Sequence, residues 1–195
     1  MYRVKQIEHT YYPFIMLIVL GLLNEILSIG LALNGIHTTL NNNIYVLLEA
    51  VLILWFFSAV NLFNNKKIFY VLLILIVCVW TAEALTVTLY NQCTYYRIIY
   101  SFLIVLLSIN MINKILASEQ RALLKNSLFL ICICFTFYYT LNSLVNAFWL
   151  YGLLKSREFL QGIQDIMMYT NLLNNLIFTI AIIWIPRKQA SILPY

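Results

Sequence analysis

Apolar residues dominate this chain in six long runs, and short polar segments separate one run from the next. The six runs cover these residues: 12–33, 44–63, 68–90, 98–115, 128–150 and 166–185. About 20 apolar residues are enough for a helix to cross the hydrocarbon core of a bilayer. The pattern therefore predicts an all-α fold, a single bundle of six transmembrane helices that occupies residues 1–195.

Composition agrees with a membrane protein. The chain is 63% hydrophobic and only 10% charged, and its mean hydropathy is +0.88, far from the balance of a soluble domain. The predicted connections are short, as at 64–67 and 91–97, and leave no room for a soluble catalytic or nucleotide-binding domain. We therefore expect the lipid bilayer to be the main partner, and place the function in the bundle, at its rims or in a partner protein.

Basic residues flank the spans and predict their orientation. The net charge of +5 is explained by the positive-inside rule, without a nucleic-acid partner. If the chain starts inside, nine basic residues fall on the inner side: Arg3, Lys5, Lys66, Lys67, Lys114, Arg121, Lys125, Arg187 and Lys188. Three fall outside: Arg97, Lys155 and Arg157. Both termini are therefore predicted to be cytoplasmic, which agrees with an even number of spans.

Three consecutive spans each carry one glutamate: Glu25, Glu49 and Glu83. An ionisable side chain in hydrocarbon costs about 2.5 to 3.5 kcal/mol on insertion scales, so each acid needs a compensating use. At about 1.5 Å per residue, the three acids share a layer roughly 8 to 12 Å below the outer ends of their spans. Several asparagines join the same layer: Asn24, Asn142, Asn146, Asn171, Asn174 and Asn175. Five spans contribute to it, namely all but the fourth.

Two interpretations of this polar layer remain open. No lysine or arginine lies in the middle of a span to neutralise the acids. Each acid is then either protonated, because desolvation and neighbouring like charges favour the neutral form, or faces a hydrated cavity that admits a cation or an amine. A neutral acid paired with an asparagine could also simply hold two helices together. We favour an outward-facing ligand pocket for the acids, and helix packing for the individual asparagines.

The sequence offers little material for catalysis. The two histidines, His9 and His37, lie in loops or at the membrane interface, and the sole aspartate, Asp165, lies in a loop. Neither the H-E-x-x-H zinc pattern nor a glycine-rich phosphate loop is present. We therefore expect a protein that is not an enzyme and that has no catalytic residues, no metal site and no cofactor.

Three segments resemble a family of small uncharacterised bacterial membrane proteins of about this length: Asn24-Glu25, Ile44-Tyr45 with Glu49, and Asn174-Asn175 through Trp184-Ile185. The resemblance covers most of the chain and departs from the family at Glu83. It implies a multi-pass protein of the bacterial inner membrane, with an accessory role beside a signalling protein. It implies no activity.

Three functions follow from these observations. The first is a small sensor or accessory subunit with an outward-facing polar pocket for a cation or small polar ligand, whose occupancy shifts helix packing and is read by a membrane or cytoplasmic signalling partner. The second is a cation- or proton-coupled transporter, which discontinuous helices and internal repeats would support; the sequence shows neither. The third is a structural membrane scaffold in which the acids are neutral packing groups.

Overall fold

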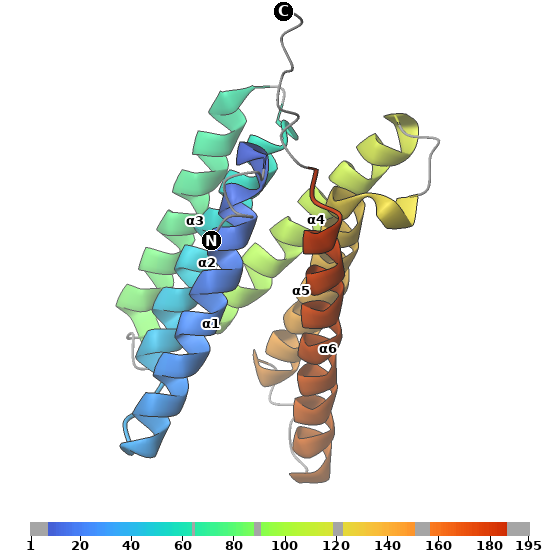
Figure 1. The fold of residues 1–195 in the computed structure, drawn as a ribbon. Coiled ribbons are helices and arrows are strands. Elements are labelled where there is room, and N and C mark those ends of the chain that lie inside the picture. Colours follow the sequence, from blue (N-terminus) through green and yellow to red (C-terminus); the bar gives the residue numbers. More distant parts are fainter. Residues whose placement is uncertain (1–7, 64, 88–90, 119–122, 151–156, 187–195) are drawn as a thin grey trace, which may run out of the picture.

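Six long helices make up the protein in its computed structural model, which describes residues 8–63, 65–87, 91–118, 123–150 and 157–186 (Figure 1). The helices are α1 (Tyr12–Leu33), α2 (Thr39–Ala59), α3 (Lys66–Val87), α4 (Thr94–Ser118), α5 (Ser127–Leu150) and α6 (Arg157–Ile183). Two 3-10 turns, η2 (His9–Tyr11) and η3 (Leu123–Lys125), precede α1 and α5. All six helices are long and apolar enough to cross a membrane. The predicted all-α fold with six candidate spans is confirmed.

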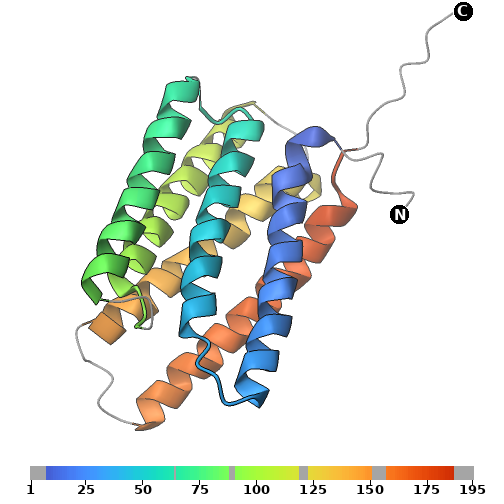
Figure 2. The same cartoon turned by 90° about the vertical axis from the view of Figure 1, so that its left-hand side faces the viewer.

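The helices form two layers of three. Figure 2 shows α1, α2 and α3 side by side in one layer, with α4, α5 and α6 crossing behind them. Within the layers, α1 packs on α2 and α5 packs on both α4 and α6, while α3 contacts α4 and so joins the two layers. The helix α4 runs obliquely from the end of α3 towards α5 (Figure 1). Because of this tilt, the two layers lie apart on one side of the bundle.

The second helix begins at Thr39, five residues earlier than the sequence predicts. Two of the asparagines expected in a loop find partners on neighbouring segments, and this allows the helix to include them. The amide of Asn41 donates to Asn24 Oδ1 at 2.8 Å, and the amide of Asn43 donates to the Asn91 carbonyl at 2.8 Å. Asparagine has a low helix propensity, and a hydrogen bond to a neighbouring segment, worth about 0.5 to 1.5 kcal/mol, offsets that cost.

Some predicted features fall outside the described residues. They include the predicted end of the third span at Tyr90 and the following members of the charge count: Arg3, Lys5, Arg121, Lys155, Arg187 and Lys188. The predicted orientation of the termini stays a prediction.

Aromatic side chains hold the two layers together at the end where α1 begins and α6 finishes. The Phe14 ring lies 5.7 Å from Phe56 and 5.3 Å from Phe178, measured between centroids. Phe135 contacts Phe56 across the layers at 6.2 Å. Two of these three pairs, Phe14 with Phe178 and Phe135 with Phe56, meet edge-to-face, an arrangement that adds about 0.5 to 1.5 kcal/mol per pair beyond the area buried. This aromatic cluster closes the bundle at one end and leaves space beside it.

Candidate ligand-binding cavity

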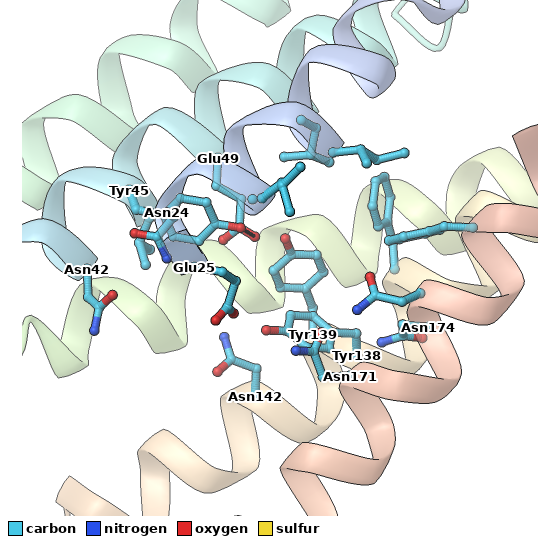
Figure 3. A pocket seen from close by; sticks show the side chains of 18 of the residues that line it. Asn24, Glu25, Asn42, Tyr45, Glu49, Tyr138, Tyr139, Asn142, Asn171 and Asn174 are labelled. Atoms are coloured by element: carbon cyan, nitrogen blue, oxygen red, sulfur yellow. Dashed lines mark hydrogen bonds between the residues drawn. The ribbon is translucent and has the colours of Figure 1, made fainter. Parts of the chain in front are cut away.

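A cavity of about 540 Å³ lies between the two layers (Figure 3). Its polar lining comes from five helices, α1, α2, α4, α5 and α6: Asn24, Glu25, Asn42, Tyr45, Glu49, Arg97, Tyr100, Tyr138, Tyr139, Asn142, Asn171, Asn174 and Asn175. This volume lies within the range of pockets that hold small molecules, about 300 to 1,000 Å³. The cavity is therefore the candidate site of the molecule.

Most of the predicted site residues meet at this cavity. Seven of them line it: Asn24, Glu25, Glu49, Asn142, Asn171, Asn174 and Asn175. Glu83 and Asn146 do not. The set of contributing helices also differs from the prediction, because α4 lines the cavity and α3 does not. The expected pocket of three acids is thus corrected to a cavity with two, while a ligand-binding role for these residues stays a prediction.

Glu83 is used elsewhere, at the start of α4. Its carboxylate accepts hydrogen bonds from the backbone N–H of Tyr95, at 3.0 Å, and of Tyr96. The first N–H groups of a helix have no partner within the helix, and the positive end of the helix dipole favours an anion there. Glu83 lies near the end of α3, within hydrogen-bonding distance of the first turn of α4. The acid therefore caps a helix, which explains how its burial is compensated.

Asn146 lies behind the cavity wall. Its amide donates to the backbone carbonyl of Asn142 at 2.7 Å and to the side-chain oxygen of the same residue at 3.0 Å. Its own side-chain oxygen accepts a hydrogen bond from Gln92 at 3.1 Å. Asn146 thus ties α5 to the connection between α3 and α4, and supports Asn142 from behind.

Glu49 is buried at the cavity wall and is held by two phenols. Tyr45 donates to Glu49 Oε1 and Tyr100 donates to Glu49 Oε2, each at 3.1 Å. Asn142 in turn donates to the Tyr100 oxygen at 3.4 Å and to Ser101 Oγ at 3.0 Å. A buried acid requires such donors, because burying an unsatisfied polar group costs several kcal/mol. The result is a hydrogen-bonded chain that connects α2, α4 and α5.

The neighbours Asn24 and Glu25 differ in their hydrogen bonding. Asn24 accepts the Asn41 amide and so pairs α1 with α2. Glu25 is exposed, and no described residue gives it a hydrogen bond or an ion pair. Figure 3 shows its carboxylate pointing away from α1 into the space between the helices. Glu25 is therefore the acid that is free to meet a ligand.

Two donors at the cavity have no partner among the described residues. The Nη2 of Arg97 donates to the backbone carbonyl of Asn42 at 3.4 Å, but its buried Nε makes no hydrogen bond. Asn174 is only 4% exposed, and its Nδ2 has no partner either. Leaving a buried donor unsatisfied costs about 1 to 3 kcal/mol. Water or a ligand with acceptor atoms would remove that cost.

Sequence reasoning missed Arg97 because the fourth span was predicted to begin at Ile98, directly after it, which placed this arginine at the outer rim. The helix α4 begins at Thr94 instead, so Arg97 lies in its first turn. The available signal was the three-residue spacing of Arg97 and Tyr100, which places both on one face of a helix.

The cavity changes character along its length. Asn42 and Arg97 belong to the first turns of α2 and α4 and form the polar end. Leu17, Phe135 and Phe178 line it beside the aromatic cluster and form the apolar end. The described residues contain no group of three or more His, Cys, Asp or Glu side chains placed to hold a metal ion. The arrangement suits a ligand with a polar end and an apolar end.

No protein-family model, curated protein or solved structure matches this chain. The resemblance to small bacterial membrane proteins, with the inner membrane it implies, therefore stays a prediction. The fold and the cavity define the class: this is a polytopic membrane protein with six candidate spans that contact lipid, five of which line a polar cavity.

Proposed function

We propose that this protein is a small membrane sensor or accessory subunit that binds a cation or a small polar ligand in the cavity between its layers. One observation carries the proposal. Glu25 and Glu49, on two adjacent helices, line the same cavity, and neither has an ion pair with a basic residue in the described part of the chain. Acidic groups in a cavity with low-dielectric walls attract cations strongly.

Ligand binding has a route to the rest of the bundle. Glu49 is linked through Tyr100 to Asn142, so the α2 wall is coupled to α4 and α5. A ligand that also contacts Glu25 on α1 and Asn174 on α6 would draw the two layers together. Such a ligand shifts the equilibrium between an open and a closed packing of the layers by the difference in its binding free energy for the two. The shifted packing is what a membrane or cytoplasmic signalling partner would read.

A binding role is favoured over transport. Each of the six described helices is continuous, whereas transporters commonly use broken helices at their binding sites. The cavity also ends against the side chains of Phe135 and Phe178. Transport remains the alternative, and proteoliposome flux under a pH gradient separates the two. A sensor without transport gives no flux above that of empty liposomes.

The test uses the full chain in nanodiscs, titrated with 3-methylbutylamine as an organic cation and with 3-methylbutanol as its neutral control. Glu25→Gln should weaken binding of the amine by about tenfold, the effect of losing one charge-assisted contact. The exposed position of Glu25 means that the melting temperature of the free protein should not change.

Glu83→Gln is the matched control for that experiment. It removes the charge that caps α4 and should lower the melting temperature of the free protein, with a loss of about 0.5 to 2 kcal/mol. The affinity for the amine should remain that of the unmodified protein. Equal amine binding by the unmodified protein and by a Glu25→Gln, Glu49→Gln double variant would contradict the proposed function.

A further inference from the structure

We propose that the ligand of this cavity is a zwitterion, in which an ammonium group meets Glu25 and Glu49 while a carboxylate or phosphate group meets Arg97 and Asn174. The inference rests on the proposed function and deepens it, because it assigns the chemical class of the ligand. It draws on three features of the cavity: the charges at its wall, its unfilled donors and its apolar end.

Acidic and basic side chains line the same cavity. Arg97 and the two acids all line it, yet no ion pair joins them in the described structure. Opposite charges that are kept apart in a low-dielectric site each need a counter-charge. A simple cation would compensate the acids and leave Arg97 uncompensated, and a simple anion would do the reverse. A zwitterion compensates both and brings no net charge into the membrane.

The unfilled groups are donors, and this favours a ligand that carries acceptor atoms over one that is only a cation. The Nε of Arg97 and the Nδ2 of Asn174 are buried and need acceptor atoms. An ammonium group has three donors and no acceptor, so it cannot satisfy either of them. Carboxylate and phosphate oxygens can. Figure 3 shows Asn174 extending from α6 towards the tyrosines that line the cavity.

The apolar end indicates what else the ligand carries. Leu17, Phe135 and Phe178 line the cavity beside the aromatic cluster, so a ligand that fills it buries hydrocarbon there, at about 25 cal/mol per Å². An α-amino acid with an apolar side chain has this composition, and so does a phosphoethanolamine lipid. Both combine an ammonium group, an oxyanion and an apolar part. The two sources, water and bilayer, are distinguished in the test.

The test uses the full chain in phosphatidylglycerol nanodiscs, which contain no ammonium group. L-leucine is compared with 3-methylbutylamine, which lacks the carboxylate, and with 4-methylpentanoate, which lacks the ammonium. In a parallel arm, phosphatidylethanolamine replaces part of the lipid, and the melting temperature and the lipid retained on purification are measured. We expect L-leucine or phosphatidylethanolamine to bind at least about tenfold more tightly than either single-charge analogue.

Asn174→Leu should affect the stability of the free protein and the affinity for the zwitterion differently. It replaces an unsatisfied buried amide by an apolar group of similar size, which is neutral or stabilising for the free protein. It should nevertheless weaken binding of the zwitterion while leaving the affinity for the amine unchanged. Arg97→Gln should likewise abolish the advantage of the zwitterion over the amine. A purely structural role for these residues would not separate the two ligands.

The outcomes are distinct. Binding of L-leucine assigns the ligand to the aqueous side, and binding of phosphatidylethanolamine alone assigns it to the bilayer; both support the inference. If the amine binds in a manner that depends on Glu25, and neither zwitterion binds more tightly, the zwitterion inference is overturned and the proposed function stands. Binding of 4-methylpentanoate as tight as that of L-leucine also overturns it. If none of these compounds binds, both proposals fall.

Discussion

Tyr96 and Tyr100 stack on each other in α4, with their ring centroids 5.1 Å apart, but their hydroxyl groups differ. The Tyr100 hydroxyl donates to Glu49 and accepts from Asn142. The Tyr96 hydroxyl is buried and has no partner among the described residues. Two neighbouring residues of the same type thus allow the hydrogen-bonded chain at the cavity wall to be tested with an internal control.

Tyr100→Phe should lower the free energy of unfolding by about 1 to 3 kcal/mol, because it removes a donor from a buried acid. Tyr96→Phe should be neutral or stabilising, because it removes a hydroxyl that is buried without a partner. Unfolding in mixed micelles, followed by circular dichroism, measures both. Equal losses for the two variants would show that the Tyr100 hydroxyl contributes no more than packing.

At the level of the helices, α1 and α2 pair through polar side chains in the half of α1 nearer its end. The Asn41 amide contacts both Asn24 Oδ1 at 2.8 Å and Ser28 Oγ at 3.1 Å. Hydrogen bonds between membrane helices are modest, about 0.6 kcal/mol on average and about 1.7 at most, since the separated helices also find other partners. Asn24 therefore contributes to helix pairing as well as to the cavity wall.

A double-mutant cycle with Asn24→Ala and Asn41→Ala should give a coupling energy of about 0.6 to 1.7 kcal/mol. Asn34 offers the control pair with Asn41, because its amide donates to the Gly30 carbonyl within its own helix. That second cycle should give no coupling beyond about 0.3 to 0.5 kcal/mol. If the coupling energy between Asn24 and Asn41 is no larger than that of the control cycle, this hydrogen bond does not pair the helices.

Two glycines on α1 differ in their position relative to the cavity, and substitutions at them distinguish filling of the cavity from a change in the helix itself. Gly21 lines the cavity, and a Cβ there would lie 3.6 Å from Tyr45 Oη. A Cβ at Gly30 would have nothing within 4 Å. A large side chain at the first position occupies the cavity, while at the second it extends into open space.

Gly21→Leu should therefore weaken ligand binding by about tenfold or more, measured with L-leucine or with 3-methylbutylamine, without changing any charge. Gly30→Leu should leave the affinity unchanged, and both variants should favour the helix because leucine is the better helix former. Unaltered binding in Gly21→Leu would place the ligand outside this cavity.

For the whole molecule, α1 begins and α6 finishes at the same end of the bundle, as Figure 2 shows. Six crossings return the chain to the side from which it started, and the bias of basic residues predicts that this side is the cytoplasm. Green fluorescent protein fused after Tyr195 should therefore fluoresce, and alkaline phosphatase at the same position should be inactive. Active phosphatase would show that the orientation is the reverse of the predicted one, with the polar end of the cavity towards the cytoplasm.

The amino-acid sequence by itself determined the six helices, the membrane class and seven of the polar residues that line the cavity. Hydrophobicity and segment length are local properties, and a bilayer converts them directly into spans. Depth is local as well, since it follows from a count of residues along a helix. Glu25, Glu49 and the asparagines of α6 could therefore be assigned to one layer before any contact was known.

Only the tertiary structure decided which of these residues face one another. Glu83 was placed in the same layer as Glu25, but depth does not specify the direction in which a side chain points. That direction depends on the rotation of each helix and on its neighbours, and packing settles both. Arg97 of α4 lines the cavity, whereas Glu83 of α3 accepts hydrogen bonds from backbone N–H groups at the start of α4. Two acids and an arginine share the site because six helices pack in this one arrangement.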